Sequence, residues 1–181
     1  NWRRTDLRLF RFDRFPLRQP VSAEGSEPLP EALLAEGVRL AGQLSSRNGQ
    51  PIQSDLHEKW ASQGVVFEAL DAAAVQRESL VRPYLTDRIV HPTADKFAAL
   101  HSACWSGGTL LYVPRGVVID EPLHVLSAMS ERGTDFGRTI VVLEAGAEAT
   151  LLTETASDAR DGSGLHCGAI EIHVGPRAKL R

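Results

Sequence analysis

The chain has 181 residues, enough for one domain with a sizeable core or for a small cap followed by part of a repetitive domain. Its net charge of -3 gives no overall positive field, which argues against nucleic acid or anionic lipid as a partner; the basic stretch at 3–18 is the exception, and we interpret it as a solvated face. No apolar run approaches the roughly 18 to 20 residues that cross a bilayer, so we expect a cytoplasmic protein.

The first 71 residues are irregular. Prolines and glycines recur throughout them, which argues against long helices. Short apolar runs at 38–44 and 65–70, with the turn pair Asn48-Gly49 between them, predict a few short strands joined by loops. We interpret this part as a modest cap region.

Helical periodicity follows in two segments. Alanine, valine and leucine recur at helical spacing near 71–82, where Pro83 is expected to interrupt the helix. A second helix is predicted near 94–105, with Thr93 as its N-cap and Gly107-Gly108 as its stop. One face of that helix is expected to carry Phe97, Leu100, His101 and Cys104.

A repeat of short strands begins after the paired glycines. Three segments share the order strand, tight turn and strand, and Val113, Leu143 and Val174 hold equivalent places in them. The spacings are therefore 30 and 31 residues. A repeat of this length without helices is typical of coils that stack on one another.

We therefore predict a mainly β fold. Residues 108–181 should form the first coils of a right-handed parallel β-helix, preceded by a small α/β N-terminal cap region with two helices at residues 1–107. Alternation predicts that Ile170, Ile172 and Val174 face the core and that Glu171 and His173 face water or a partner. Because a few coils leave an unpaired edge, we expect the chain to be a piece of a longer polypeptide.

Three segments resemble one family when they are taken in order: DKFAALHSAC (95–104), GTLLYVPRGVVIDEPLHV (108–125) and GLHCGAIEIHVGPRAKL (164–180). They are similar to the SufB/SufD family of iron–sulfur cluster assembly scaffold proteins. The stretches 2–7 and 80–85 add to the likeness, which is weakest between Arg18 and Ala69.

Within that family the chain resembles SufD more than SufB. SufB-like chains tend to carry a cysteine after the glutamate that ends the second β unit, whereas this chain reads Glu154-Thr155-Ala156-Ser157. The resemblance implies a non-catalytic scaffold subunit in a heteromeric complex with SufB-like and SufC-like subunits, with ATP hydrolysis in the SufC-like subunit.

The resemblance also implies where cofactors belong. An iron–sulfur cluster would be held transiently by the full complex, and a flavin is associated with that complex in the family. The residues that handle the cluster lie in later parts of the family's chains, so none is carried over here. We expect no cofactor to be bound by this stretch itself.

Cys167 beside His166 is the most tempting candidate for a metal site, because thiolate and imidazole are ligands that iron and zinc accept. If 166–174 is one regular strand, however, the two neighbours point to opposite faces. Cys167 and His173 share a face but stand roughly 20 Å apart, at about 3.3 Å per residue.

The remaining candidates also favour structural roles. Cys104 fits a small core residue of its helix, and His57, His91 and His124 lack the spacing of a helical metal site. No nucleophile elbow, phosphate loop or dinucleotide-binding turn occurs. We therefore assign no catalytic, cofactor-binding or metal-ligating residue.

Two other functions stay open. A generic β-helix protein-interaction module would use the same exposed strands to pair with a partner chain. A polysaccharide-acting β-helix enzyme would need secretion and a cleft of paired acids, and neither is visible in the sequence. A hexapeptide-repeat acyltransferase is rejected, because its coils repeat about every 18 residues.

Overall fold

The computed structural model describes residues 8–17, 28–86, 89–157 and 162–181. The helical elements are η2 (Phe12–Arg14), α1 (Glu58–Ala61), α2 (Leu70–Gln76), α3 (Glu78–Thr86) and α4 (Lys96–Cys104). The strands are β1 (Gly42–Arg47), β2 (Gln50–Leu56), β3 (Val66–Ala69), β4 (Gly107–Val113), β5 (Leu123–Met129), β6 (Thr134–Asp135), β7 (Gly137–Leu143), β8 (Glu148–Ala149), β9 (Leu151–Ser157), β10 (Leu165–His166), β11 (Ala169–Val174) and β12 (Lys179–Leu180).

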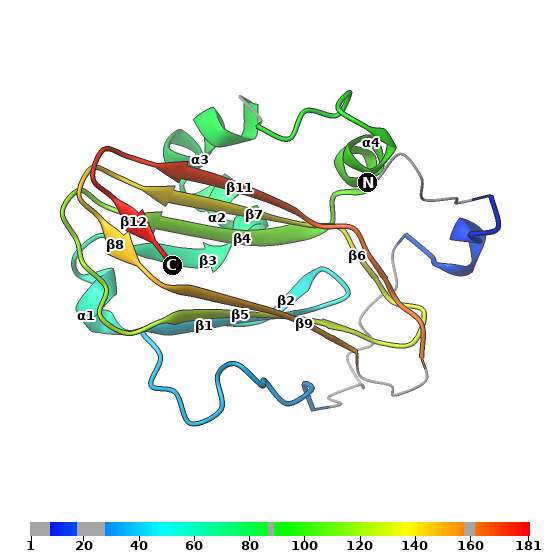
Figure 1. The fold of residues 1–181 in the computed structure, drawn as a ribbon, viewed down its shortest axis with the longest axis horizontal. Coiled ribbons are helices and arrows are strands. Elements are labelled where there is room, and N and C mark those ends of the chain that lie inside the picture. The colour runs from blue at the N-terminus through cyan, green and yellow to red at the C-terminus, as the bar shows by residue number, and fades with distance from the viewer. Residues whose placement is uncertain (1–7, 18–27, 87–88, 158–161) are drawn as a thin grey trace.

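The strands form two facing four-stranded sheets and two two-stranded sheets (Figure 1). The orders of the larger sheets are β2-β1-β5-β9 and β11-β7-β4-β3, and the smaller sheets pair β10 with β6 and β12 with β8. The short pairs lie at the bends where the chain passes between the two larger sheets (Figure 1). Helices α2 and α3 lie behind the second large sheet, and α4 lies at its end near β6.

The repeat spacing read from the sequence is confirmed by the strand register. Val113 of β4 pairs with Leu143 of β7, and Leu143 pairs with Val174 of β11, in parallel throughout. In the first large sheet, β5 pairs with β9 in parallel, with Leu123 beside Leu151. Equivalent residues of successive units therefore lie side by side.

The expected right-handed parallel β-helix is nevertheless wrong as a description of this fold. Both large sheets are mixed, because β2 runs antiparallel to β1 and β3 runs antiparallel to β4. Helices pack against the second sheet, so the architecture is α/β. The reason is local: the two-residue turn Asn48-Gly49, with φ of 52° and 75°, joins β1 and β2 as a hairpin, and such short turns connect only antiparallel neighbours.

Two apolar cores hold the sheets together. The first lies between the sheets and includes Leu44 and Phe67 from the N-terminal region with Leu111 and Val141 from the repeat. The second lies between β4, β7 and the helices α2 and α3. Because β1 pairs with β5 and β3 with β4, each large sheet draws strands from both sides of residue 107. The division into two domains at that residue stays a prediction.

The helices differ in detail from the expectation. The helix expected near 71–82 is divided at Arg77, whose φ of −132° and ψ of 40° are not helical and whose guanidinium pairs with Glu68. Pro83 lies inside α3 rather than interrupting it. The second helix begins later than expected, because Asp95 and not Thr93 is its N-cap and accepts bonds from the amides of Phe97 and Ala98.

The faces of β11 are as expected, but their exposure is not. Ile172 and Val174 pair in register with Val141 and Leu143 of the core between the sheets, and therefore lie on the same face as these residues. The side chains do alternate between two faces, but Glu171 is 1% exposed whereas Ile170 is 55% exposed. Glu171 lies on the face that carries the chain segment after α3, which covers it. Ile170, Ile172 and Val174 lie at the edge of the second sheet, where no further strand is paired within the described residues.

Both tyrosines of the chain, Tyr84 and Tyr112, lie on the face of the second large sheet that is covered by α2 and α3. Burial and a hydrogen bond to Glu144 raise the pKa of Tyr112 to about 12, and burial with the charge of Glu144 raises the pKa of Tyr84. We expect the absorbance of tyrosinate at pH 10 to be well below half of its final value. Ultraviolet titration measures this ionisation. The control is the same chain unfolded in urea, in which the tyrosines should ionise near their ordinary pKa of 10.0. A folded chain half ionised at pH 10 would contradict the burial.

Within the described ranges, no helix is long and apolar enough to cross a membrane.

Candidate functional site

A hollow lies where α4 meets the junction of β10 and β11. We name it the corner pocket; its volume is about 540 Å³. It is lined by Phe10, Phe12, Val90, Asp95, Phe97, Ala98, Leu100, His101, Leu165, His166, Cys167, Gly168, Ala169 and Ile170. The pocket brings His101 of α4 to the adjacent residues His166 and Cys167, which the sequence had considered without His101.

His166, which lines the corner pocket, is paired with Asp135, which lies behind it and does not line the pocket. The Nδ1 atom of His166 lies 3.0 Å from Oδ2 of Asp135, and the other carboxylate oxygen accepts the amide of Gly137. The two residues stand side by side because β6 and β10 are paired in parallel, with His166 beside Asp135 in the register. The hydrogen bond that His166 donates to Asp135 raises the pKa of His166, and burial opposes this shift.

Cys167 stands apart from this pair. Its thiol donates to the carbonyl oxygen of Phe97 at 3.7 Å. Burial raises the pKa of the Cys167 thiol, and the negative charge of Asp95 adds to the shift. A neutral thiol is a weak nucleophile and a weak metal ligand, so the surroundings of Cys167 do not favour either role.

The argument that separated His166 from Cys167 assumed one regular strand over 166–174. The strand is in fact interrupted, since β10 ends at His166 and β11 begins at Ala169. Even so, His166 bonds to Asp135 whereas Cys167 bonds to the helix backbone. Among the described residues, no group of three His, Cys, Asp or Glu side chains stands close enough to hold a metal ion.

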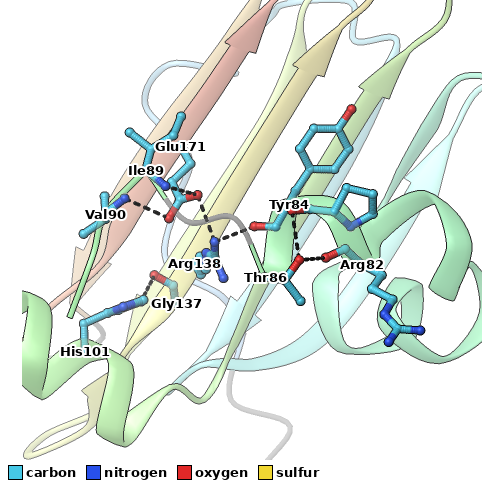
Figure 2. A network of polar contacts seen from close by, with 10 residues as sticks. Arg82, Tyr84, Thr86, Ile89, Val90, His101, Gly137, Arg138 and Glu171 are labelled. Carbon is cyan, nitrogen blue, oxygen red and sulfur yellow. Dashed lines mark hydrogen bonds and ion pairs between the residues drawn. The ribbon is translucent and has the colours of Figure 1, made fainter.

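A buried ion pair lies next to the corner pocket (Figure 2). Nη2 of Arg138 lies 2.8 Å from Oε2 of Glu171, and both side chains are almost fully buried. The same nitrogen donates to the carbonyl of Tyr84, and the Glu171 carboxylate accepts the amides of Ile89 and Val90 at 3.3 Å each. We name this group the clamp, because it fastens the segment after α3 to β7 and β11.

The clamp fixes part of the pocket wall. Val90 lines the corner pocket, and its amide is held by Glu171. His101 of α4 lies within hydrogen-bonding distance of the carbonyl of Gly137, the residue before Arg138, at 3.2 Å (Figure 2). Strand β7 therefore positions both the segment that contains Val90 and the helix on the other side of the pocket.

A second buried polar group lies on the outer face of the first large sheet. Nε2 of His124 lies 2.9 Å from Oε1 of Glu154, and the carboxylate also accepts the amides of Leu33 and Leu34. Burial by itself would raise the pKa of Glu154, but the amide of Leu34, His124 and the amide of Leu33 together lower it. This group anchors the segment before β1.

The other candidate residues have local roles. His57 caps α1 by accepting the amide of Lys59, and His91 contacts Thr93. The ring of His173 packs edge-on against Tyr84, with centroids 4.7 Å apart. Cys104 is a free, partly buried thiol at the end of α4.

The sequence analysis missed Asp135, Arg138 and Glu171. The repeat carried a signal for these residues. The register places Asp135 beside His166, and it places Glu171 two positions from the partner of Arg138, on the same face of the neighbouring strand. Applying the spacing of about one repeat to charged residues, as well as to aliphatic ones, would have identified the pairs.

The pair Asp135–His166 predicts a pH dependence. The folded-state pKa of His166 is above its ordinary value of 6.5, so its stabilisation is present below that value and lost as the pH rises through the folded pKa. We expect the unfolding midpoint in urea of the native chain to exceed that of His166→Asn by more at pH 5.5 than at pH 8.5. His57→Asn is the control, since that ring does not contact a carboxylate within the described residues. An equal difference at both pH values would contradict the assignment.

Comparison with known proteins points to one family. The model of the family described as SufBD protein N-terminal region matches residues 43–125. An iron–sulfur cluster assembly SufBD family protein of Staphylococcus epidermidis is 34% identical over 155 residues, which is 84% of this chain and 32% of the relative. A corresponding protein of Staphylococcus haemolyticus is 33% identical over 155 residues, with the same shares of the two chains.

A third relative is named iron–sulfur cluster assembly protein SufB, from Bacillus subtilis. It is 32% identical over 147 residues, covering 81% of this chain and 31% of the relative. The chain therefore spans about a third of the length of the curated relatives that it matches. These comparisons do not separate SufD from SufB.

Proposed function

Because the chain belongs to the SufB/SufD family, we propose that it is part of a scaffold protein for iron–sulfur cluster assembly. The observation that carries the proposal is the 34% identity over 84% of the chain to a protein named for that process. The cluster in this proposal is the cargo of the assembly, handled by parts of the protein beyond the stretch described.

The structure supports a scaffold in two ways. Parallel strands stacked in register make a rigid frame, since each strand is hydrogen-bonded to an equivalent strand about one repeat away. The outer strands β9 and β11 are paired on one side only among the described residues, and unpaired strand edges are surfaces on which further polypeptide can add.

We extend the proposal to a non-catalytic, SufD-like subunit of a cytoplasmic complex with SufB-like and SufC-like partners. The sequence Glu154-Thr155-Ala156-Ser157 supports SufD over SufB, because no thiol follows the glutamate. In the structure the Glu154 carboxylate is hydrogen-bonded to His124 and to two backbone amides of the segment before β1. It therefore attaches that segment to the first large sheet. ATP hydrolysis and any flavin would belong to the assembled complex.

Co-expression of the intact protein with SufB-like and SufC-like subunits tests this proposal. We expect the three proteins to co-purify through a tag on this one and to elute together in gel filtration, with iron and acid-labile sulfide in the same peak after reconstitution. The intact protein alone should show no ATPase activity. Arg82→Met, which changes an exposed side chain of α3, should behave like the unaltered protein.

The outcomes also discriminate between functions. Stable association without iron and sulfide would favour a bare interaction module. Failure to associate with either partner would contradict the assembly role altogether. Hydrolysis of an acidic polysaccharide by the protein alone would favour the enzyme alternative instead.

A further inference from the structure

The corner pocket has the size and lining of a small-molecule site, a role separate from the scaffold function. Its volume of about 540 Å³ lies within the range of roughly 300 to 1,000 Å³ that ligand sites occupy. Nine of its fourteen lining residues have apolar side chains. A smaller apolar hollow of about 300 Å³ shares Phe12, Phe97 and Leu100 with it and extends it along α4.

Aromatic rings form one wall of the corner pocket. The rings of Phe10 and Phe12 meet edge to face at 4.6 Å, and Phe15 stacks on Phe10 at 5.7 Å. The hydroxyl of Thr134 donates to the carbonyl of Pro16 at 2.9 Å, which attaches this wall to β6. Phe97 faces the pocket from α4. Such a wall favours a flat aromatic ligand over an aliphatic one, because ring faces and edges pack well together.

The charges around the pocket favour a neutral ligand. His166 is already paired with Asp135, and Asp95 already caps α4. An anion would be repelled by Asp95, and a cation would be repelled by Lys96, whose ammonium lies 5.5 Å from the centre of the Phe97 ring. Among the described residues that line the pocket, neither sign of charge would find an unpaired partner, because the charge of a protonated His166 is already balanced by Asp135.

One polar group is placed to orient the ligand. Nδ1 of His166 is engaged by Asp135, which leaves Nε2 as the second ring nitrogen, next to Gly168 on the pocket wall. A protonated imidazole donates from that atom. We propose that the corner pocket binds a neutral aromatic molecule that carries one hydrogen-bond acceptor, such as an aryl ketone, with its rings against Phe10, Phe12 and Phe97.

Prodan, a neutral naphthyl ketone whose fluorescence reports on its surroundings, tests the proposal with the intact protein. We expect a blue-shifted, saturable signal, and much weaker binding of the similarly sized anion anilinonaphthalene sulfonate. Leu100→Trp should fill the pocket and lower the affinity for prodan about tenfold or more, the equivalent of losing the burial of about two methylenes. Val75→Trp, on an exposed position of α2, should leave that affinity unchanged.

Cys167 supplies a second measurement that needs no pocket variant. Prodan should slow the alkylation of Cys167 by N-ethylmaleimide, measured by peptide mass spectrometry. Cys104, which does not line the pocket, is the internal control and should react at the same rate with and without the probe. The proposal is overturned if prodan does not bind, if the anion binds equally well, or if bound prodan leaves Cys167 unprotected. Protection of Cys167 alone supports it even if Leu100→Trp does not fold.

Discussion

Replacing Arg138 with methionine is expected to lower the free energy of unfolding by about 3–5 kcal/mol, the usual cost of removing one partner of a buried ion pair. The carboxylate of Glu171, 1% exposed, would lose its only cationic partner among the described residues. The carbonyl of Tyr84 would lose its donor as well. Urea unfolding followed by tryptophan fluorescence measures the change, since Trp60 lies in the core.

Two comparisons make this result specific. Arg82→Met breaks an exposed pair with Glu78 on α3, 3.5 Å apart, and should change stability by no more than about 0.5 kcal/mol. The double variant Arg138→Met with Glu171→Met should cost less than the sum of the two single changes, because no buried charge is left unpaired. Additive effects of the two substitutions would show that the clamp is not a coupled unit.

The clamp also illustrates what the sequence could and could not predict. The repeat spacing predicted which strands are neighbours, because aliphatic residues at 113, 143 and 174 mark equivalent places. The alternation along β11 predicted that Ile170 and Glu171 face opposite sides. It did not predict that Glu171 is the more buried of the two, because that depends on the segment at 89–90, whose amides donate to the Glu171 carboxylate.

The fold class was wrong for a related reason. The repeat accounts for the parallel pairs, but the strands from the N-terminal region are not part of the repeat. The turn pair Asn48-Gly49 was interpreted only as a loop between short strands. In the structure it joins β1 and β2 as a hairpin, and a hairpin added to a parallel set makes a mixed sheet. The antiparallel pairing of β3 with β4 depends on contacts across the chain and has no local signal.

Only part of the candidate site could be predicted from the sequence. The sequence drew attention to His166 and Cys167 because they are adjacent, yet their contacts lie with Asp135 and with the backbone of Phe97, respectively. Asp135 is 31 positions before His166, about one repeat, so the pairing follows from the register. The aromatic wall from the N-terminal segment has no such periodic relation to the pocket and required the structure.

Gly108→Ala should be the most damaging of the small substitutions, with a loss of at least about 3 kcal/mol or no soluble protein. Gly108 has a φ of +145°, and a Cβ atom at that position would overlap the carbonyl oxygen of Arg138 on the neighbouring strand. Because Gly108 and Arg138 are paired between β4 and β7, relief of the clash would require the two strands to separate beside the clamp.

Gly116→Ala separates the clash from the backbone strain. Gly116 has a φ of +73° but open space around it, so alanine there should cost only the left-handed strain of about 1–2 kcal/mol. Both variants add a methyl group to a glycine of positive φ. At position 108 the methyl group would clash with the backbone of Arg138, whereas at position 116 it would contact no other atom. Since the ladder from β4 through β7 to β11 continues into the clamp and the corner pocket, Gly108→Ala should also weaken prodan binding in whatever protein stays folded, whereas Gly116→Ala should not. Equal losses of stability in the two variants would show that β4 and β7 are not packed as closely as described.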